Sequence, residues 1–375
     1  MRRSSEQTES TFDRGRNLGA GARQDYPSEP GIRDPQPSCV SKQKPMSLKV
    51  LFIGGTGNIS LPCVAEAVTA GHRVSVFNRG KTSVDLPRSV TTIAGDLKDT
   101  AYRELGRAGF DVVCQFITFT PDQMEDDIAA FAGGTGQFIF ISSASVYEKP
   151  PRRYVITEET PTINPFWTYS QNKIACEGML RRSSGLPWTI VRPSHTVRSM
   201  LLTIFNEGDA VGRRMLAGKP VILAGDGATV WTLTRCADFA TPFVKLFGVI
   251  QALGEDFHIT SDHAYTWNDI YATIANGLGV KADIVHVPTD TLVRYNPEWE
   301  GPLMGDKTWS ALFDNSKVKR VAGDFSCEAD LARVLAEPIA RVQARLSAEG
   351  TRVDELAPLL DRIAREQRKL GALAG

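Results

Sequence analysis

The sequence lacks the features that mark membrane proteins, secreted proteins and proteins that bind polyanions. It has no excess of either charge, since 43 lysine and arginine residues balance 43 aspartate and glutamate residues among 375. No apolar run approaches the roughly 20 residues that a membrane helix needs, and no signal-peptide pattern opens the chain. We therefore expect a cytoplasmic protein with no membrane partner, and the balanced charge argues against nucleic acid as its main ligand.

Cysteine and histidine patterns exclude two further classes. The six cysteines are scattered without a Cys-x-x-Cys pair, and the histidines lack the spacing of metal ligands. In a chain of this length without a secretion signal, such cysteines are typical of reduced, mostly buried thiols. We predict no metal site and no disulfide framework.

The first 46 residues differ in composition from the rest of the chain. They hold five prolines and few large apolar side chains. Such a segment buries too little apolar surface to offset the entropy of ordering its backbone. We predict a disordered N-terminal extension.

Short apolar runs alternate with helical patterns from residue 48 onward. Strands are predicted at 49–53, 73–77, 90–93, 111–116, 137–141 and 188–191, and helices at 61–70, 101–108, 123–131 and 169–182. Near-continuous apolar runs are typical of parallel strands that are buried on both faces. The alternation predicts an α/β fold with a doubly wound parallel sheet of the Rossmann type.

A glycine-rich loop follows the first predicted strand directly. It reads Gly54-Gly55-Thr56-Gly57-Asn58-Ile59-Ser60. Glycines let backbone N–H groups approach a pyrophosphate, and the N-terminus of the next helix favours its negative charge. No Gly-Lys-Ser/Thr follows, which excludes a Walker A loop. We predict that residues 54–59 contact a dinucleotide.

The end of the second predicted strand indicates which dinucleotide binds. An acidic residue there would bind the ribose 2′-hydroxyl of NAD, but the chain has Asn78 and Arg79. A cation suits a 2′-phosphate, so NADP(H) is favoured slightly over NAD(H). Asp96 and Leu97 follow the third strand and are predicted to lie near the adenine, with a turn-capping role as the alternative for the aspartate.

Tyr169 and Lys173 are four residues apart at the start of a predicted helix, so both lie on one face. An ammonium about 4–5 Å away stabilises a phenolate by roughly 3–4 kcal/mol at an effective dielectric near 20. We therefore expect a lowered pKa for Tyr169 and a general acid–base role. Ser143 and Ser145 follow the fifth strand, where a hydroxyl can hold the substrate oxygen. The alternative is a surface tyrosine beside a lysine.

Together these motifs resemble the extended short-chain dehydrogenases/reductases, which include nucleotide-sugar epimerases and dehydratases. The glycine loop is similar to their GGTGFIG, residues 143–147 to their SATVY, and Arg192-Pro193 to the Arg-Pro after their sixth strand. The resemblance implies that Tyr169 carries the proton, Lys173 lowers its pKa and binds the nicotinamide ribose, and Ser143 orients the substrate oxygen. It also implies that Phe116 and Pro193 lie near the nicotinamide.

The same resemblance narrows the reaction. Dehydratases place Asp-Glu beside the strand-five hydroxyl, whereas this chain has Ala144 and Ser145, so dehydration is disfavoured. We predict hydride transfer at a carbinol of a sugar-like substrate, by analogy a nucleotide sugar, as an oxidoreductase or epimerase. Ser145 and His195 are candidate substrate contacts, with a loop or core role as the alternative for the histidine. The alternative function is a non-catalytic nucleotide-sensing or RNA-binding protein on the same fold.

The second half of the chain has a less regular pattern. We expect a Rossmann domain from 47–195 and 221–256, a smaller discontinuous substrate lobe from 196–220 and 257–345, and a C-terminal helix within 346–375. That helix is expected to be solvated, with an oligomer contact as the alternative, which leaves a homodimer open. Trp231 and the 299–309 stretch can stack on a base or sugar, or pack in the core.

Overall fold

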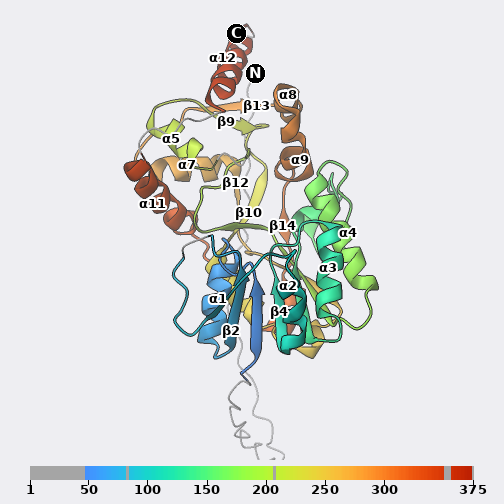
Figure 1. Ribbon diagram of the computed structural model, residues 1–375. Helices are drawn as coiled ribbons and strands as arrows, with labels where there is room; N and C mark the ends of the chain where they lie inside the picture. Colours follow the sequence, from blue (N-terminus) through green and yellow to red (C-terminus); the bar gives the residue numbers. More distant parts are fainter. Residues whose placement is uncertain (1–46, 82–83, 206–207, 350–355, 374–375) are drawn as a thin grey trace, which may run out of the picture. The chain divides into compact units, whose positions relative to one another are not determined.

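A sheet of seven parallel strands organises the molecule (Figure 1). The computed structural model describes residues 47–81, 84–205, 208–349 and 356–373, so the expected disorder of residues 1–46 lies outside the described residues. The strand order is β11-β7-β5-β4-β1-β2-β3. The strands are β1 (Lys49–Ile53), β2 (Arg73–Asn78), β3 (Thr91–Ala94), β4 (Phe110–Gln115), β5 (Thr135–Ile141), β7 (Trp188–Pro193) and β11 (Glu255–Ile259). The predicted Rossmann sheet is confirmed.

Helices cover both faces of this sheet, which explains its continuous apolar strands. In β1, Val50 and Phe52 pack in one hydrophobic cluster, whereas Leu51 and Ile53 pack in another. One face carries α1 (Ser60–Thr69), α6 (Cys236–Val244) and α10 (Ser316–Ala322). The other carries α2 (Thr100–Leu105), α3 (Pro121–Phe131) and α4 (Thr168–Arg182). Short 3₁₀ turns occupy 106–108, Ala144–Val146, Ile250–Ala252 and Pro297–Trp299.

A buried ion pair fastens α4 to the sheet. Arg192 on β7 donates from Nε and Nη2 to the two carboxylate oxygens of Glu177 on α4, at 2.9 and 2.6 Å. The Ser142 hydroxyl, just after β5, donates to the same carboxylate at 2.6 Å. Bidentate contacts of this kind fix geometry as well as distance. They hold the helix that carries Tyr169 and Lys173 against the ends of β5 and β7.

The second lobe is built from three small sheets and several helices. One sheet has the order β12 (Ala264–Thr266), β10 (Val230–Arg235), β8 (His195–Val197). The two others pair β9 (Val221–Ala224) with β13 (Ile284–Val287), and β6 (Val155–Ile156) with β14 (Leu312–Phe313). The helices are α5 (Asp209–Leu216), α7 (Trp267–Gly277), α8 (Thr289–Tyr295), α9 (Glu300–Pro302), a π-helical segment (Leu303–Lys307), α11 (Leu331–Glu349) and α12 (Ala357–Leu373).

Two expectations about the second half differ from the structure. The run 221–224 was expected in the Rossmann domain, but β9 pairs with β13, and β11 is the strand that returns to the large sheet. A short apolar run shows that a strand is buried without showing which sheet it joins. The C-terminal helix is not simply solvated, since Leu360 and Ile363 of α12 lie in the lobe core. None of the described helices has the length and apolar character to cross a membrane.

Candidate active site

Three cavities lie at the carboxyl ends of the parallel strands, where ligands bind in open α/β sheets. The outer cavity, of about 650 Å³, lies between the glycine loop and the end of β2. The middle cavity, of about 350 Å³, shares Gly54 and Gly57 with it. The inner cavity, of about 280 Å³, shares Ser143, Tyr169 and Pro193 with the middle cavity. The shared lining residues make this one continuous site.

The glycine loop has a conformation that requires its first glycine. Gly54 has a φ of 80°, and a Cβ there would lie 2.4 Å from the Ile117 side chain. Ser60 stands where the related motif has its last glycine. Its hydroxyl donates to the Gly54 carbonyl at 2.7 Å and accepts from the Gly57 N–H at 2.9 Å. The serine therefore braces the loop instead of disturbing it.

Some of the other loop residues line the cavities, and Gly55 packs against the sheet. Thr56 lines the outer cavity, and Asn58 and Ile59 line the middle one. Gly55 packs against β2, where a Cβ would lie 2.8 Å from a valine methyl group. The Asn58 carboxamide oxygen accepts from the backbone N–H and the hydroxyl of Ser199, at 3.3 and 2.9 Å. That side chain ties the loop to the second lobe.

The outer cavity is lined by more charged residues than the sequence indicated, with carboxylates of Asp122 and Asp126 as well as cations. The predicted residues that line it are Asn78, Arg79, Asp96 and Leu97. Lys81 and Lys98 line it too, and both are exposed like Arg79. The Asp96 carboxylate accepts from the Lys98 backbone N–H at 3.3 Å, so it also has the turn role named as its alternative. The lysines were missed because neither belongs to a motif.

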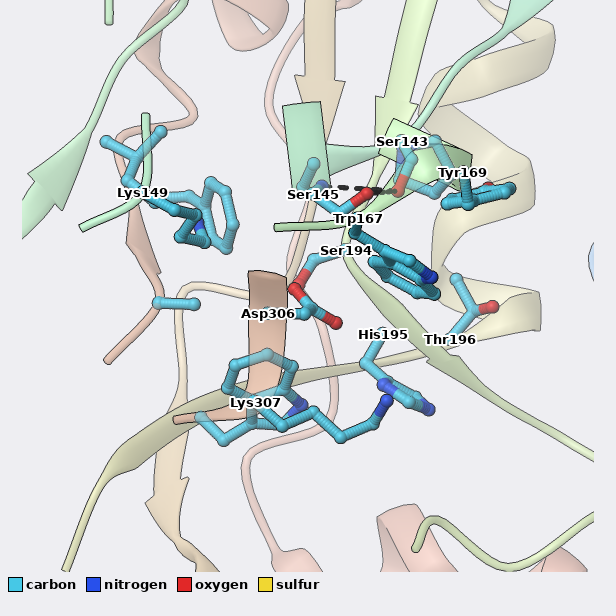
Figure 2. Close-up of a pocket in the computed structure, with 16 residues that line it drawn as sticks. Ser143, Ser145, Lys149, Trp167, Tyr169, Ser194, His195, Thr196, Asp306 and Lys307 are labelled. Carbon is cyan, nitrogen blue, oxygen red and sulfur yellow. Dashed lines mark hydrogen bonds between the residues drawn. The ribbon is translucent and has the colours of Figure 1, made fainter. Parts of the chain in front are cut away.

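The catalytic candidates Ser143 and Tyr169 lie where the middle and inner cavities meet. Figure 2 shows both beside Ser145, whose hydroxyl lies 2.9 Å from that of Ser143. Burial raises the pKa of Tyr169 above its ordinary value, a hydrogen bond with Ser143 lowers it in part, and the charge of Asp306 raises it. The phenol is therefore protonated at neutral pH.

Lys173 lines the middle cavity but is engaged by backbone carbonyls. Its Nζ donates to Thr118 at 2.7 Å and to Ile141 at 2.8 Å, and lies 5.9 Å from the centre of the Tyr169 ring. Burial lowers the pKa of Lys173 to about 8. The expected lowering of the pKa of Tyr169 is contradicted: burial of the ring dominates, and the ammonium is held by carbonyl oxygens.

A buried carboxylate positions the carbonyl that holds this lysine. Asp127 on α3 accepts from the Thr118 hydroxyl at 2.5 Å and from Gln115 Nε2 at 2.9 Å. Tyr102 also donates to it. Burial raises the pKa of Asp127 to about 6, and these hydrogen bonds limit the rise. The network fixes the turn after β4, against which the glycine loop packs.

The remaining predicted contacts also reach the cavities. Phe116 lines the middle cavity, and its ring stacks on Phe52 with centres 6.0 Å apart. Ser145 and His195 line the inner cavity. Burial, together with the charge of Lys307, lowers the pKa of His195 to about 3, so the imidazole is neutral.

Several inner-cavity residues were not predicted as site residues. They are Lys149, Trp167, Thr196, Asp306 and Lys307. Trp231 also lines this cavity, whereas Trp299 stacks on Phe205 in the lobe core. No sequence motif connects these positions, because they come from separate loops that meet only in the folded chain.

The residues present fit a nicotinamide dinucleotide along the outer and middle cavities. The glycine loop leaves no room for a Cβ at Gly54, and the exposed cations Arg79, Lys81 and Lys98 are among the residues that line the outer cavity. The hydroxyls of Ser143 and Tyr169 and the Lys173 ammonium line the other end. The inner cavity continues beyond them into the second lobe.

Comparison with known proteins points to the same coenzyme. Residues 54–200 match the family described as NAD(P)H-binding. The 2'-dehydrokanamycin reductase of Streptomyces kanamyceticus is 25% identical over 320 residues, covering 82% of this chain and 88% of that protein. Chloroplast stem-loop binding protein of 41 kDa b from Arabidopsis thaliana is 27% identical over 265 residues, covering 67% of this chain and 66% of that protein.

Solved structures show the same fold. UDP-glucuronic acid 4-epimerase from Bacillus cereus, in complex with NAD, has a TM-score of 0.63 at 18% identity, covering 81% of this chain and 99% of that one. An epimerase from Methanothermobacter thermautotrophicus has a TM-score of 0.64 at 15% identity, covering 80% and 94%. These structures are less than 25% identical to this chain and show a shared fold, while the family match places an NAD(P)H-binding region at residues 54–200.

Proposed function

On the premise of this NAD(P)H-binding fold, we propose that the protein is a reductase of a ring ketone on a sugar-like substrate. The site is Ser143, Tyr169 and Lys173, and the coenzyme is NADP(H) in preference to NAD(H). The observation that carries the proposal is the position of Ser143 and Tyr169 on the boundary between the middle and inner cavities. A carbonyl in the inner cavity can therefore meet both hydroxyls beside the coenzyme site.

Reduction of a carbonyl needs a proton donor at the site. When bound, the nicotinamide would supply the hydride for the carbonyl carbon. The carbonyl oxygen needs a proton at the same time, and the phenol of Tyr169, whose pKa burial raises further above neutrality, holds one. Ser143 donates a hydrogen bond to that oxygen. Lys173 holds the ribose near the proton donor, and water restores the proton to Tyr169.

Two comparisons support reduction of a sugar-like ring. The reductase from Streptomyces kanamyceticus aligns with most of this chain and is named for a keto derivative of an aminoglycoside. The structural neighbours include an epimerase of a nucleotide sugar. The inner cavity, at about 280 Å³, lies just below the range of 300–1,000 Å³ that is typical of drug-sized ligands. That room suits one ring, so the nucleotide of a nucleotide sugar would extend outside the inner cavity.

The test combines coenzyme oxidation with one conservative variant. NADPH consumption at 340 nm is followed with keto derivatives of hexopyranosides and of nucleotide sugars. Tyr169→Phe should lower kcat/KM by about 10³-fold, in the range for a lost general acid, with an unchanged Kd for NADPH. The matched control is Tyr154→Phe, at a position that is 83% exposed, which should leave turnover unchanged. Full activity of Tyr169→Phe contradicts the proposal.

A second candidate is RNA binding without catalysis, favoured by the relative from Arabidopsis thaliana that is named a stem-loop binding protein. Binding of that kind depends on phosphate contacts and weakens steeply with salt. Titration of an RNA stem-loop at 50 and 200 mM salt separates the two functions. Salt-dependent affinity together with no NADPH binding supports the second candidate and contradicts the first.

A further inference from the structure

Two charged side chains in the inner cavity, Lys149 and Asp306, form no hydrogen bond or ion pair with any residue that the structure describes. Lys149 is only 5% exposed, and Asp306 is half-buried. Within the described part of the chain, neither side chain has a hydrogen bond or an ion pair. Buried charges are normally paired, because removing them from water is costly. Glu177 and Arg192 show the paired arrangement in this same molecule.

The segment that carries Asp306 has an unusual conformation. Residues Leu303–Lys307 form a π-helical turn, a rare structure that is frequent at functional sites. Asn164 ties this turn to the catalytic region, because its Nδ2 donates to the carbonyls of Gly305 and Ser145, both at 2.7 Å. The position of Asp306 relative to Ser143 and Tyr169 is thereby fixed.

A flat aromatic wall completes the cavity. Trp167 packs beside Tyr169 with ring centres 4.9 Å apart. Two glycines make room for it, since a Cβ at Gly301 would lie 2.4 Å from the indole and one at Gly305 would lie 2.7 Å from the Trp167 side chain. Figure 2 shows Asp306 in the middle of the cavity, with Trp167 and Tyr169 on one side and Lys149 on another.

The two charged groups act on each other across this space. Burial lowers the pKa of Lys149, and the charge of Asp306 opposes that change. Burial raises the pKa of Asp306, while Lys307 and Lys149 oppose it. The two side chains line the same cavity and form no ion pair with each other, so both can bind groups of a ligand in that cavity.

We infer that Asp306 and Lys149 are specificity-determining residues that hold neighbouring hydroxyls of a single substrate ring; this rests on the proposed reductase function. A hydroxyl can donate to the Asp306 carboxylate while its neighbour accepts from Lys149, and the C–H face of the ring lies on Trp167. A ring without hydroxyls leaves both charges unpaired. The substrate class is therefore a polyhydroxylated ring ketone, and these contacts select which carbon faces the coenzyme.

The experiment compares hydroxylated and plain ring ketones with the full chain and NADPH. The probes are scyllo-inosose, methyl 3-keto-glucopyranoside and methyl 4-keto-glucopyranoside, against cyclohexanone. We expect kcat/KM for the best hydroxylated ketone to exceed that for cyclohexanone by about 10⁴-fold, as in sites built to bind a substrate hydroxyl. Asp306→Asn and Lys149→Met should each reduce that ratio by about 10- to 100-fold.

Matched controls and a binding measurement keep the outcomes separate. Asp290→Asn and Lys281→Met change exposed residues of the same lobe and should leave the ratio intact. If the wild type reduces no hydroxylated ketone better than cyclohexanone, or if the site variants keep the full ratio, the inference is overturned. Loss of NADPH binding, or activity independent of Tyr169, instead contradicts the reductase function itself.

Discussion

The two halves of the candidate site are constructed in different ways. The coenzyme half comes from consecutive strand-to-helix units between residues 54 and 193, and each unit contributes its contacts directly after a strand. The substrate half combines Lys149, Trp167, His195, Trp231 and Asp306, which lie far apart in the chain. The first half depends on local backbone geometry, whereas the second depends on how the lobe packs. The lobe is therefore where related proteins can acquire different substrates on one coenzyme fold.

The difference between the two halves of the site is tested most severely by adding a methyl group to the glycine loop. Gly54→Ala should weaken NADPH binding by about 100-fold, because the residue has a positive φ and its Cβ would meet Ile117. Gly279→Ala is the matched control in the lobe, since Gly279 has a φ of 75° and open space around its Cβ position. It should cost only about 1 kcal/mol of stability. Fluorescence titration gives the Kd of each variant for NADPH. Equal Kd values for the two variants would contradict the distinction between the two halves of the site.

The junction between the halves is tested at Asn164. Asn164→Ala removes the donor of two buried carbonyls, and should lower the free energy of unfolding by about 2–4 kcal/mol. The KM for ring ketones should rise, while the Kd for NADPH stays constant. Urea unfolding and steady-state kinetics measure these effects. The control Asn276→Ala, at an exposed position on α7, should change neither the free energy of unfolding nor the KM. An unchanged KM in Asn164→Ala would show that other contacts position the π-helical turn.

A smaller effect concerns the choice of coenzyme. Arg79→Ala should weaken NADPH binding by about tenfold, the value of one charge-assisted hydrogen bond to phosphate, because Lys81 and Lys98 remain beside the cavity. The Kd for NADH should not change, since NADH has no 2′-phosphate. Parallel titrations of both coenzymes provide the measurement. Equal losses for the two would show that Arg79 does not contact the phosphate.

The smallest expected effect is a pH dependence limited to the coenzyme half. Lys173 has a lowered pKa of about 8, so it loses its positive charge as the pH rises through that value. The affinity for NADPH should then fall about threefold between pH 7 and pH 9, as one charge-assisted contact weakens. Lys173→Met should bind more weakly at pH 7 and show no such decline. A decline that begins only near pH 10 would mean that burial does not perturb this lysine.

Much of the coenzyme half could be predicted because its signals are local. An apolar run, the glycines directly after it and a tyrosine four residues before a lysine each depend on neighbouring residues. The seven-stranded sheet and the positions of Arg79, Ser143 and Tyr169 at the cavities agree with that analysis. The hydrogen bond from the Ser60 hydroxyl to the Gly54 carbonyl was not predictable, since the related motif has a glycine at the position of Ser60.

The doubly wound sheet and the order in which the predicted coenzyme contacts follow its strands could be inferred from the amino-acid sequence, because hydrophobic periodicity and backbone freedom are properties of short segments. Tertiary packing was needed to show that β9 joins β13, that Asp306 and Lys149 line the same cavity, and that the pKa of Tyr169 is raised. Each of these depends on burial and on contacts between distant segments. Desolvation raises the pKa of the phenol, and no pattern along the chain records how deeply a side chain is buried.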